Sequence, residues 1–402
     1  MPVTVTAITW KDLVMPEAAS FVLEAAHEPL HADTIEVAAP GPEEVLVEVA
    51  ACGVCHTDLH VIKDEVAFPK PAVLGHEVSG IVRQVGPSVT HVQPGDRVAC
   101  SFIMPCGRCR HCAKGLEDLC ENFFNYNRLK GQLYDGTTRY TRTPEGPSDG
   151  QSGGRQSEGQ PQELAMYSMG GHSMSCVVPS RGVFPLPDSV PLLEAAVLGC
   201  SLFTGHGAVC SVAQVQPGEN VAVIAAGGVG LSIIHLARAA GADRIFAIDV
   251  DDDKLALARE LGATDVINSQ NADPVQHITD ALGHGVDVAF EALGSVATVK
   301  LAVDLLDDGG RAVLAGIAPA GQTMDVDITK VVRRKLQILG SFGASASSTM
   351  PEVIRLAAEG QLDLDTLITH RFAFEQTDEA YQLLNERKIL GRGLIETNPS
   401  LA

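Results

Sequence analysis

Four cysteines lie close together with a spacing typical of a metal site. Two residues separate Cys106 from Cys109 and Cys109 from Cys112, and Cys120 follows after seven more. Four thiolates complete the tetrahedral coordination of Zn²⁺, so such a site would hold a lobe of about residues 100–122 in shape without reacting. A four-iron cluster would favour three residues before the last cysteine and a proline after it. The spacing therefore predicts a structural zinc.

A second set of residues could bind a reactive metal. Its members are soft or borderline ligands and their neighbours in three separate segments: Cys55, His56, Asp58 and His60; His76 and Glu77; and Cys200. A catalytic zinc takes three protein ligands and keeps one position open, a count that Cys55, His76 and Cys200 satisfy. Taken singly, a buried cysteine is more often just a small apolar residue. Spacing alone cannot bring these three positions together.

A glycine-rich turn follows a buried, strand-like segment and precedes a helix-like one. The turn reads AAGGVG, so two glycines of the GxGxxG fingerprint are present and Ala225 replaces the first. A Cβ at that position is awkward only if the turn requires a positive φ. Asp249 ends the next strand and would accept bonds from the adenosine ribose, which favours NAD over NADP. The residues expected at the coenzyme are Gly227, Gly228, Val229, Gly230 and Asp249. The alternative is a βαβ unit that binds no nucleotide.

The surrounding pattern predicts two kinds of structure. The first 120 residues are rich in short β-branched runs bounded by Gly and Pro. From about residue 200, strands alternate with helices, which indicates βαβ units and a parallel sheet. The last 60 or so residues add an apolar helix and a return to a β-like segment. Residues 143–163 are rich in Gly, Ser, Pro and Gln, and we expect them to form an exposed loop.

Composition narrows the class of function. The chain has 402 residues, 45% of them apolar, and a net charge of −21, which argues against nucleic-acid and anionic membrane partners. The sequence has no run of 18 or more apolar residues, so no transmembrane helix is expected. The first residues do not resemble a secretory signal. Ten cysteines without such a signal indicate metal or thiol chemistry in a reducing cytoplasm rather than a disulfide framework.

These motifs, in this order, resemble those of the zinc-containing medium-chain alcohol dehydrogenases. The segments are GVCHTDLH, GHE, the four-cysteine loop, LGCSLFTG and the glycine-rich turn, and they extend over nearly the whole chain. The resemblance implies an α/β protein with a GroES-like, β-rich catalytic domain and a Rossmann coenzyme domain with a doubly wound parallel sheet. The catalytic domain would comprise residues 1–201 and 342–402, and the coenzyme domain residues 202–341. It also implies two zinc ions per subunit.

The resemblance assigns roles residue by residue. Cys55, His76 and Cys200 would bind the catalytic zinc, with Glu77 approaching the metal from behind. Asp58 would orient the zinc-bound histidine. The remaining roles are a proton relay of Thr57 and His60, coenzyme contacts from His56, Lys254 and Arg392, and a substrate pocket lined by Thr57 and Phe102. Four further cysteines have no assigned role and are expected in packing: Cys52, Cys100, Cys176 and Cys210.

The implied function is an NAD-dependent zinc alcohol dehydrogenase that interconverts primary or simple secondary alcohols with aldehydes or ketones. One alternative is oxidation of the hydroxymethyl adduct of glutathione, which needs a basic pocket that the sequence does not identify. A polyol dehydrogenase would commonly have Glu in place of Cys200. The sequence is also compatible with a nicotinoprotein that retains NAD, and with a zinc- and NAD-binding sensor or structural protein without turnover. The connection from Asn125 to Arg142 resembles that of the dimeric enzymes, which favours a homodimer and leaves a tetramer open.

Overall fold

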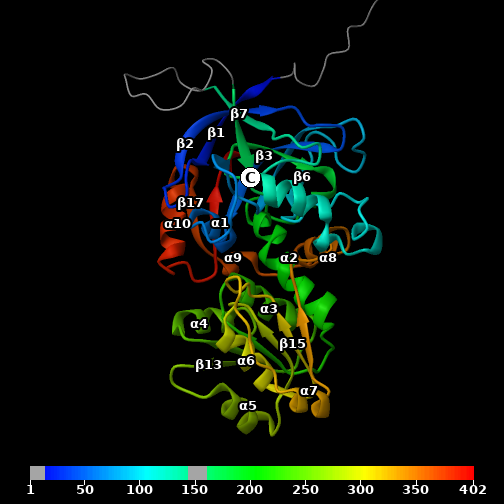
Figure 1. Cartoon of the computed structure of the whole chain (residues 1–402), viewed down its shortest axis with the longest axis vertical. Helices are drawn as coiled ribbons and strands as arrows, with labels where there is room; N and C mark the ends of the chain where they lie inside the picture. Colours follow the sequence, from blue (N-terminus) through cyan, green and yellow to red (C-terminus); the bar gives the residue numbers. More distant parts are fainter. Residues whose placement is uncertain (1–13, 144–160) are drawn as a thin grey trace, which may run out of the picture.

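The computed structural model describes residues 14–143 and 161–402, so most of the predicted 143–163 loop lies outside the described part. Figure 1 shows two lobes stacked along the long axis of the molecule. The N-terminal and C-terminal strands lie together in one lobe, and the central part of the chain forms the other.

The first lobe contains a closed barrel and a seven-stranded sheet. The barrel strands, in spatial order, are β1 (Val14–Leu23), β2 (His31–Ala38), β7 (Tyr140–Arg142), β8 (Gln162–Met166) and β4 (Ala72–Val73). The sheet strands are β10 (Val183–Pro185), β6 (Arg97–Cys100), β5 (Val78–Val85), β3 (Glu44–Val54), β18 (Arg392–Glu396) and β17 (Ile368–Ala373), with β9 (Ser175–Pro179) also paired to β3. Strand β3 is almost wholly buried because the lobe covers both of its faces.

The end of the chain completes this sheet. Strand β18 pairs antiparallel with β3, so that Gly393 lies opposite Val54 and Leu394 opposite Gly53. This register brings Arg392 next to the segment that begins with Cys55, although more than 300 residues separate them in the sequence. A C-terminal element thereby becomes part of the wall of the candidate site.

The second lobe is built on a six-stranded parallel sheet. Its spatial order is β13 (Asp265–Asn268), β12 (Ile245–Asp249), β11 (Val221–Ile224), β14 (Val286–Glu291), β15 (Leu306–Leu314) and β16 (Gln337–Gly340). The direction of strand progression reverses between β11 and β14, which is the Rossmann arrangement, and ligands bind such sheets at the carboxyl ends of strands near that point. The sheet confirms the predicted fold class.

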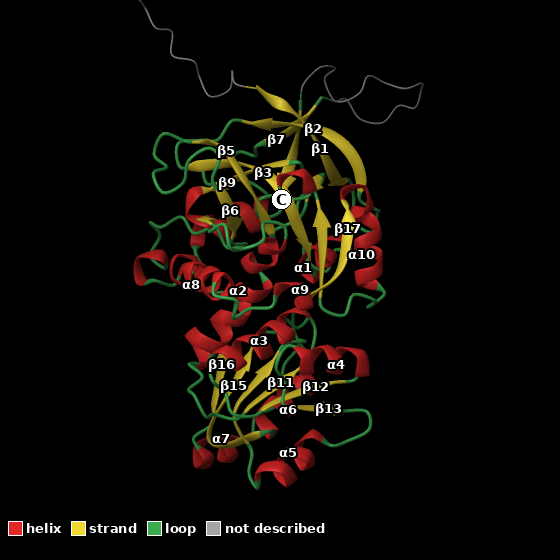
Figure 2. Cartoon of the chain, turned by 180° about the vertical axis from the view of Figure 1, so that it is seen from behind, coloured by secondary structure: helices red, strands yellow, loops and turns green. Residues whose placement is uncertain are grey.

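Helices lie on both faces of this sheet (Figure 2). They are α3 (Gly228–Ala239), α4 (Asp252–Glu260), α5 (Pro274–Leu282), α6 (Val296–Asp304) and α7 (Ile328–Arg334). Their start points follow from polar caps. The Asp251 carboxylate accepts bonds from the backbone N–H groups of Asp253 and Lys254 at the start of α4. Ser295 and Thr298 form a capping box at the start of α6.

The remaining helices connect or flank the lobes. They are α1 (His56–Ile62), α2 (Ser201–His206), α8 (Ala346–Ala358), α9 (Leu364–Leu367) and α10 (Thr377–Asn385), with shorter 3-10 and π turns between them. Around α2, the continuous helical stretch Glu194–Ala213 has the length and apolar composition of a membrane span. Since 78% of its most apolar window is buried inside the protein, it packs as a core helix.

Candidate active site

The three predicted ligands of the reactive metal meet in space. Cys55 directly precedes α1, Cys200 directly precedes α2, and His76 lies in the loop before β5. One ligand atom from each of these residues and from Glu77 lies within 4.8 Å of all the others, and all four residues are buried. The Cys200 Sγ atom is 3.6 Å from Nε2 of His76. The fold therefore assembles a donor set that spacing in the sequence cannot.

The His76 ring is held by a buried hydrogen-bond chain. Its Nδ1 lies 3.1 Å and 3.0 Å from the two carboxylate oxygens of Asp58, which leaves Nε2 directed at the two thiols. Asp58 also accepts bonds from the Gly75 N–H at 3.1 Å and from the Tyr381 hydroxyl at 2.9 Å. The Tyr381 oxygen lies 2.7 Å from Nε2 of His172. This arrangement fixes the ring orientation that a metal ligand requires.

The electrostatics of the group suit a divalent cation. A hydrogen bond from the Cys200 thiol lowers the pKa of Cys55 well below its ordinary value, and the same bond together with burial raises the pKa of Cys200. Burial opposes the charged form of His76, but the charges of Asp58 and Cys55 raise its pKa to about 9. Protons thus occupy the places where a cation would bind, and zinc binding would release them. Two thiolates and an imidazole fit zinc and leave one position open.

Glu77 and Arg392 form a buried ion pair behind this group. Oε1 of Glu77 accepts a hydrogen bond from Nη2 of Arg392, while Oε2 has no partner in the described part of the chain. Gly53 is required beside them, because a Cβ there would lie 2.2 Å from that oxygen. One carboxylate oxygen of Glu77 therefore lies among the candidate ligand atoms, and Arg392 balances its charge.

Arg392 also connects this group to the glycine-rich turn. A Cβ on Gly228 would lie 2.6 Å from Cδ of Arg392, so the side chain passes directly over the start of α3. No heavy atom lies within 4 Å of a Cβ built on Gly227, which leaves space for a ligand at the free N–H groups. At Gly230 a Cβ would meet the Ala225 carbonyl oxygen at 1.8 Å, so glycine is required for close strand–helix packing.

Ala225 occupies the left-handed conformation that its position in the fingerprint would give to glycine, with a φ of 73°. That conformation costs a residue with a Cβ about 1–2 kcal/mol. Ala225→Gly removes this strain. However, glycine gives the unfolded chain more conformational freedom, which lowers the free energy of unfolding by about 0.4–1 kcal/mol. We therefore expect a net stabilisation of about 0.5–1 kcal/mol, measured as a higher midpoint of thermal unfolding. Ala226→Gly, at a buried neighbour without positive φ, is the control and should destabilise; equal effects of both changes would contradict the strain argument.

Asp249 ends β12 beside the turn, as predicted. Its carboxylate accepts bonds from the backbone N–H groups of Ala226 at 2.7 Å, Val250 at 2.7 Å and Asp251 at 3.1 Å. These bonds hold the side chain at the carboxyl end of the sheet, where the ribose of a dinucleotide would lie. Lys254 follows in the first turn of α4.

The predicted relay residues lie along α1. The Thr57 Oγ1 atom is 3.4 Å from the Cys55 sulfur, and His60 lies one turn further along the helix. Nδ1 of His60 forms a short hydrogen bond with Glu65, a partner that the sequence did not reveal. Partial burial lowers the pKa of His56, the charge of Cys55 opposes this, and the charges of Arg392 and Lys254 lower it further. The predicted coenzyme contacts on three different elements thus lie near one another.

Aromatic rings form the wall beside the metal ligands. The ring centroid of Phe102 lies 6.0 Å from that of His76, as expected for a pocket residue, and the Tyr167 ring lies 6.1 Å away. Phe203 and Phe342 pack edge-on against Phe102 at 5.8 Å and 6.0 Å. The side chains around the His76 ring are therefore mostly aromatic. Sequence reasoning missed Tyr167, since no motif includes it.

The four-cysteine group also assembles as predicted. One sulfur from each of Cys106, Cys109, Cys112 and Cys120 lies within 4.8 Å of the others. Backbone N–H groups point at these sulfurs, from Cys106 to Cys120 at 3.3 Å and from Cys109 to Cys106 at 3.4 Å. Such bonds stabilise thiolates, so a four-sulfur zinc site fits this loop.

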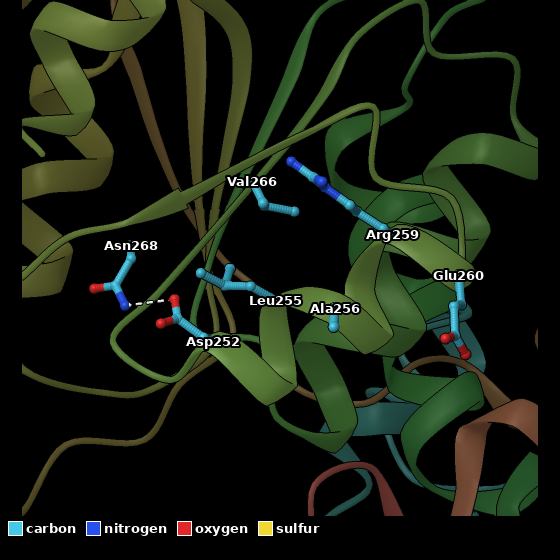
Figure 3. Close-up of a pocket in the computed structure, with 7 residues that line it drawn as sticks. All are labelled: Asp252, Leu255, Ala256, Arg259, Glu260, Val266 and Asn268. Carbon is cyan, nitrogen blue, oxygen red and sulfur yellow. Dashed lines mark hydrogen bonds between the residues drawn. The ribbon is translucent and has the colours of Figure 1, made fainter. Parts of the chain in front are cut away.

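The other cysteines and the surface hollows lie apart from both groups. Cys52, Cys100 and Cys176 are fully buried, as expected for packing, but Cys210 is exposed, so the expectation was wrong for that residue. A surface hollow of about 520 Å³ runs along α4 and β13 (Figure 3), where Asn268 donates to Asp252 at 2.7 Å. None of the predicted site residues lines this hollow.

The Tyr381 hydroxyl offers a test of the buried chain behind His76. Tyr381→Phe keeps the ring but removes one of the hydrogen bonds that hold Asp58. We expect zinc affinity to fall about tenfold, because changing residues that orient a metal ligand typically costs roughly 10–100-fold in affinity. Competition with a chelator measures this. Tyr140→Phe is the control, because that hydroxyl is also buried but bonds the Met169 carbonyl at 3.0 Å. Unchanged zinc affinity in Tyr381→Phe would show that the chain does not orient the ligand.

Comparisons with known proteins indicate the family of this chain. A family model described as zinc-binding dehydrogenase matches residues 228–359, and one described as alcohol dehydrogenase GroES-like domain matches residues 41–188. A solved alcohol dehydrogenase zinc-binding domain protein from Burkholderia ambifaria is 31% identical, with a TM-score of 0.86 over 95% of this chain and 99% of its own. The benzyl alcohol dehydrogenase of Acinetobacter calcoaceticus is 30% identical, with a TM-score of 0.85 over 95% and 99%.

A more distant match is a zinc-binding dehydrogenase from Sinorhizobium meliloti bound to NADP. It is 25% identical, with a TM-score of 0.77 over 95% of this chain and 100% of its own. The two family models together extend over more than half of the chain, and the Burkholderia ambifaria protein is 31% identical over 95% of it. The chain belongs to the zinc-containing medium-chain alcohol dehydrogenase family.

Proposed function

We propose that this protein is a zinc-dependent alcohol dehydrogenase that transfers hydride between primary or simple secondary alcohols and NAD. The observation that carries the proposal is the convergence of Cys55, His76 and Cys200 beside a glycine-rich turn. We propose residues 202–341 as the coenzyme domain, with residues 1–201 and 342–402 as the catalytic domain. One zinc would lie at each cysteine group.

The residues of the chain have separate tasks in this reaction. Zinc bound at the reactive group would act as a Lewis acid on the alcohol hydroxyl, and NAD would accept the hydride. Thr57 stands beside the ligand Cys55 and would take up the hydroxyl proton, and His60 would pass it to solvent with Glu65 at its other side. The aromatic wall excludes water from the reacting atoms.

Charges at the carboxyl end of β12 favour NAD. Asp249 is followed by Val250, Asp251, Asp252 and Asp253, so a 2′-phosphate would meet negative charge. His56, Lys254 and Arg392 would face the pyrophosphate.

The coenzyme preference provides the test of this proposal. Zinc-loaded protein should oxidise members of an alcohol panel with NAD in preference to NADP, followed by NADH absorbance. Asp249→Asn removes the charge at the ribose and should lower the NAD-to-NADP ratio of kcat/KM at least about tenfold. Asp280→Asn, at an exposed acid on α5 outside this run of charges, is the control and should leave the ratio within about twofold. A wild-type preference for NADP would refute the ribose argument, and no turnover of any alcohol would refute the proposed function.

We also propose a homodimer in a reducing, cytoplasmic setting. All ten cysteines are free of disulfides. Strand β16 ends the parallel sheet, and exposed apolar side chains lie nearby at Ile317, Ile328 and Val332. An open edge beside apolar surface suits pairing with a second copy. Light scattering of the purified protein measures the oligomeric state, and a monomer would refute this part.

A further inference from the structure

Arg128 lies in a cage of aromatic rings. It ends the π-helical turn Phe123–Arg128, and its guanidinium carbon is 4.1 Å from the ring centroid of Tyr167, 5.0 Å from that of Phe123 and 5.8 Å from that of Phe102. Such contacts hold a cation by its flat face and leave the N–H groups at its edge free. The cage therefore positions the guanidinium without using its hydrogen-bond donors.

No anion of the described chain pairs with this cation. Within residues 14–143 and 161–402, Arg128 has neither a hydrogen bond nor a salt bridge to a side chain, and its Nη1 atom is buried without a partner. By contrast, Arg139 in the same region bonds Glu44 at 2.7 Å and Asp135 at 2.7 Å. A partly buried guanidinium with free donors is costly unless an anion completes it.

The cage shares its walls with the reactive metal group. Phe102 and Tyr167 both lie edge-on to the His76 ring, and the same two rings contact the Arg128 guanidinium. The separations from Tyr167, 6.1 Å to the His76 centroid and 4.1 Å to the guanidinium carbon, place the cation within about 10 Å of the ligand ring. The charge of Arg128 also lowers the pKa of Tyr167, against the larger effect of burial.

We propose that Arg128 binds a carboxylate at the far end of the substrate, so that the enzyme prefers short alcohols and aldehydes that carry an acid group. This inference rests on the proposed function and names its substrate class. A local cation is required for such substrates, because the protein carries a net charge of −21 and repels anions at long range. The reaction is unchanged: hydride leaves the carbinol carbon for NAD, a proton leaves the hydroxyl for solvent, and the carboxylate takes no part.

Matched substrate pairs test the proposal. We expect wild-type enzyme to prefer para-carboxybenzyl alcohol over para-methylbenzyl alcohol, and succinic semialdehyde over pentanal. Arg128→Met removes the charge but keeps much of the side-chain bulk. It should lower kcat/KM for the acidic member of each pair about tenfold to a hundredfold, mainly through KM, as expected for a charge-assisted bond. The neutral member should change by less than about twofold, and Arg128→Lys should retain part of the preference.

Lys130→Met is the matched control. Lys130 is an exposed cation on the same segment that lies 5.3 Å from the ring centroid of Tyr126, outside the cage, so its loss should leave the preference unchanged. Thermal melting shows whether Arg128→Met remains folded. Calorimetric binding of terephthalate to the zinc-loaded protein is a readout besides turnover, and it should be lost in Arg128→Met but not in Lys130→Met.

The remaining outcomes separate the ways in which the proposal could fail. Equal loss for acidic and neutral substrates in Arg128→Met would show that the cage is only structural and would overturn the inference. A wild-type preference for the neutral members would do the same while leaving the proposed function intact. Failure of every alcohol with NAD would refute the proposed function, whereas terephthalate binding would still report on Arg128. Formaldehyde with glutathione forms a further arm: Arg128-dependent turnover of that adduct alone would identify the carboxylates of a peptide thiol as the group recognised.

Discussion

Replacing Cys55 with alanine should abolish the proposed alcohol oxidation and remove one of the two zinc ions that we propose for each subunit. The side chain supplies one of the two sulfurs that meet His76 within 4.8 Å, and a zinc with three protein ligands cannot lose one without a large loss of affinity. A bound zinc would strongly lower the pKa of the substrate hydroxyl, so its loss should reduce kcat at least about a thousandfold. Elemental analysis and NADH absorbance measure the two effects.

Cys52→Ala is the matched control for this change. Cys52 lies three residues earlier in the sequence and is fully buried, its thiol lies 3.7 Å from the Gly53 carbonyl oxygen, and it is not among the candidate metal ligands. We expect two zinc ions and turnover within about threefold of wild type, because this change creates only a small cavity. Near-normal rates in Cys55→Ala, or loss of zinc from Cys52→Ala, would show that the ligands have been assigned wrongly.

Motif order predicted the fold and both metal groups, but only through the resemblance to a family. The parallel sheet follows from strands that alternate with helices between residues 221 and 340, a local signal. The meeting of Cys55, His76 and Cys200 depends on long-range packing, which no local periodicity contains. The same holds for Arg392, because only the pairing of β18 with β3 brings it to Glu77.

Residues without a motif could not be found from the sequence. Tyr381 and His172 act through a chain of hydrogen bonds in which each member belongs to a different element, so neither is marked by spacing. Arg128 belongs to no recognised motif, and only the packing of three aromatic rings around it shows its position. For Ala225, the sequence showed that alanine replaces the first glycine of the fingerprint. Only the structure showed that this alanine adopts a positive φ.

Cys112→Ser should remove the structural zinc and leave the catalytic one. Serine is a poor zinc ligand, and a closed four-sulfur site contributes folding energy directly, so the whole loop loses its support. That loop docks on α8, where Glu117 accepts a bond from the Ser347 N–H at 2.8 Å and donates its own N–H to Ser345 at 3.3 Å. We expect the half-life for thermal inactivation to fall at least about tenfold. The initial rate at low temperature should fall much less.

Arg110→Ala separates loss of the metal from damage to the loop surface. Arg110 lies between Cys109 and Cys112 and forms an exposed ion pair with Glu121 at 2.5 Å, which contributes at most about 1 kcal/mol. This variant should keep two zinc ions and most of its thermal stability. If Cys112→Ser were as stable as Arg110→Ala, the four cysteines would not support the lobe. If Cys112→Ser instead lost all turnover at low temperature while retaining one zinc, the loop would shape the reactive cleft directly, and its role as a remote support would be wrong.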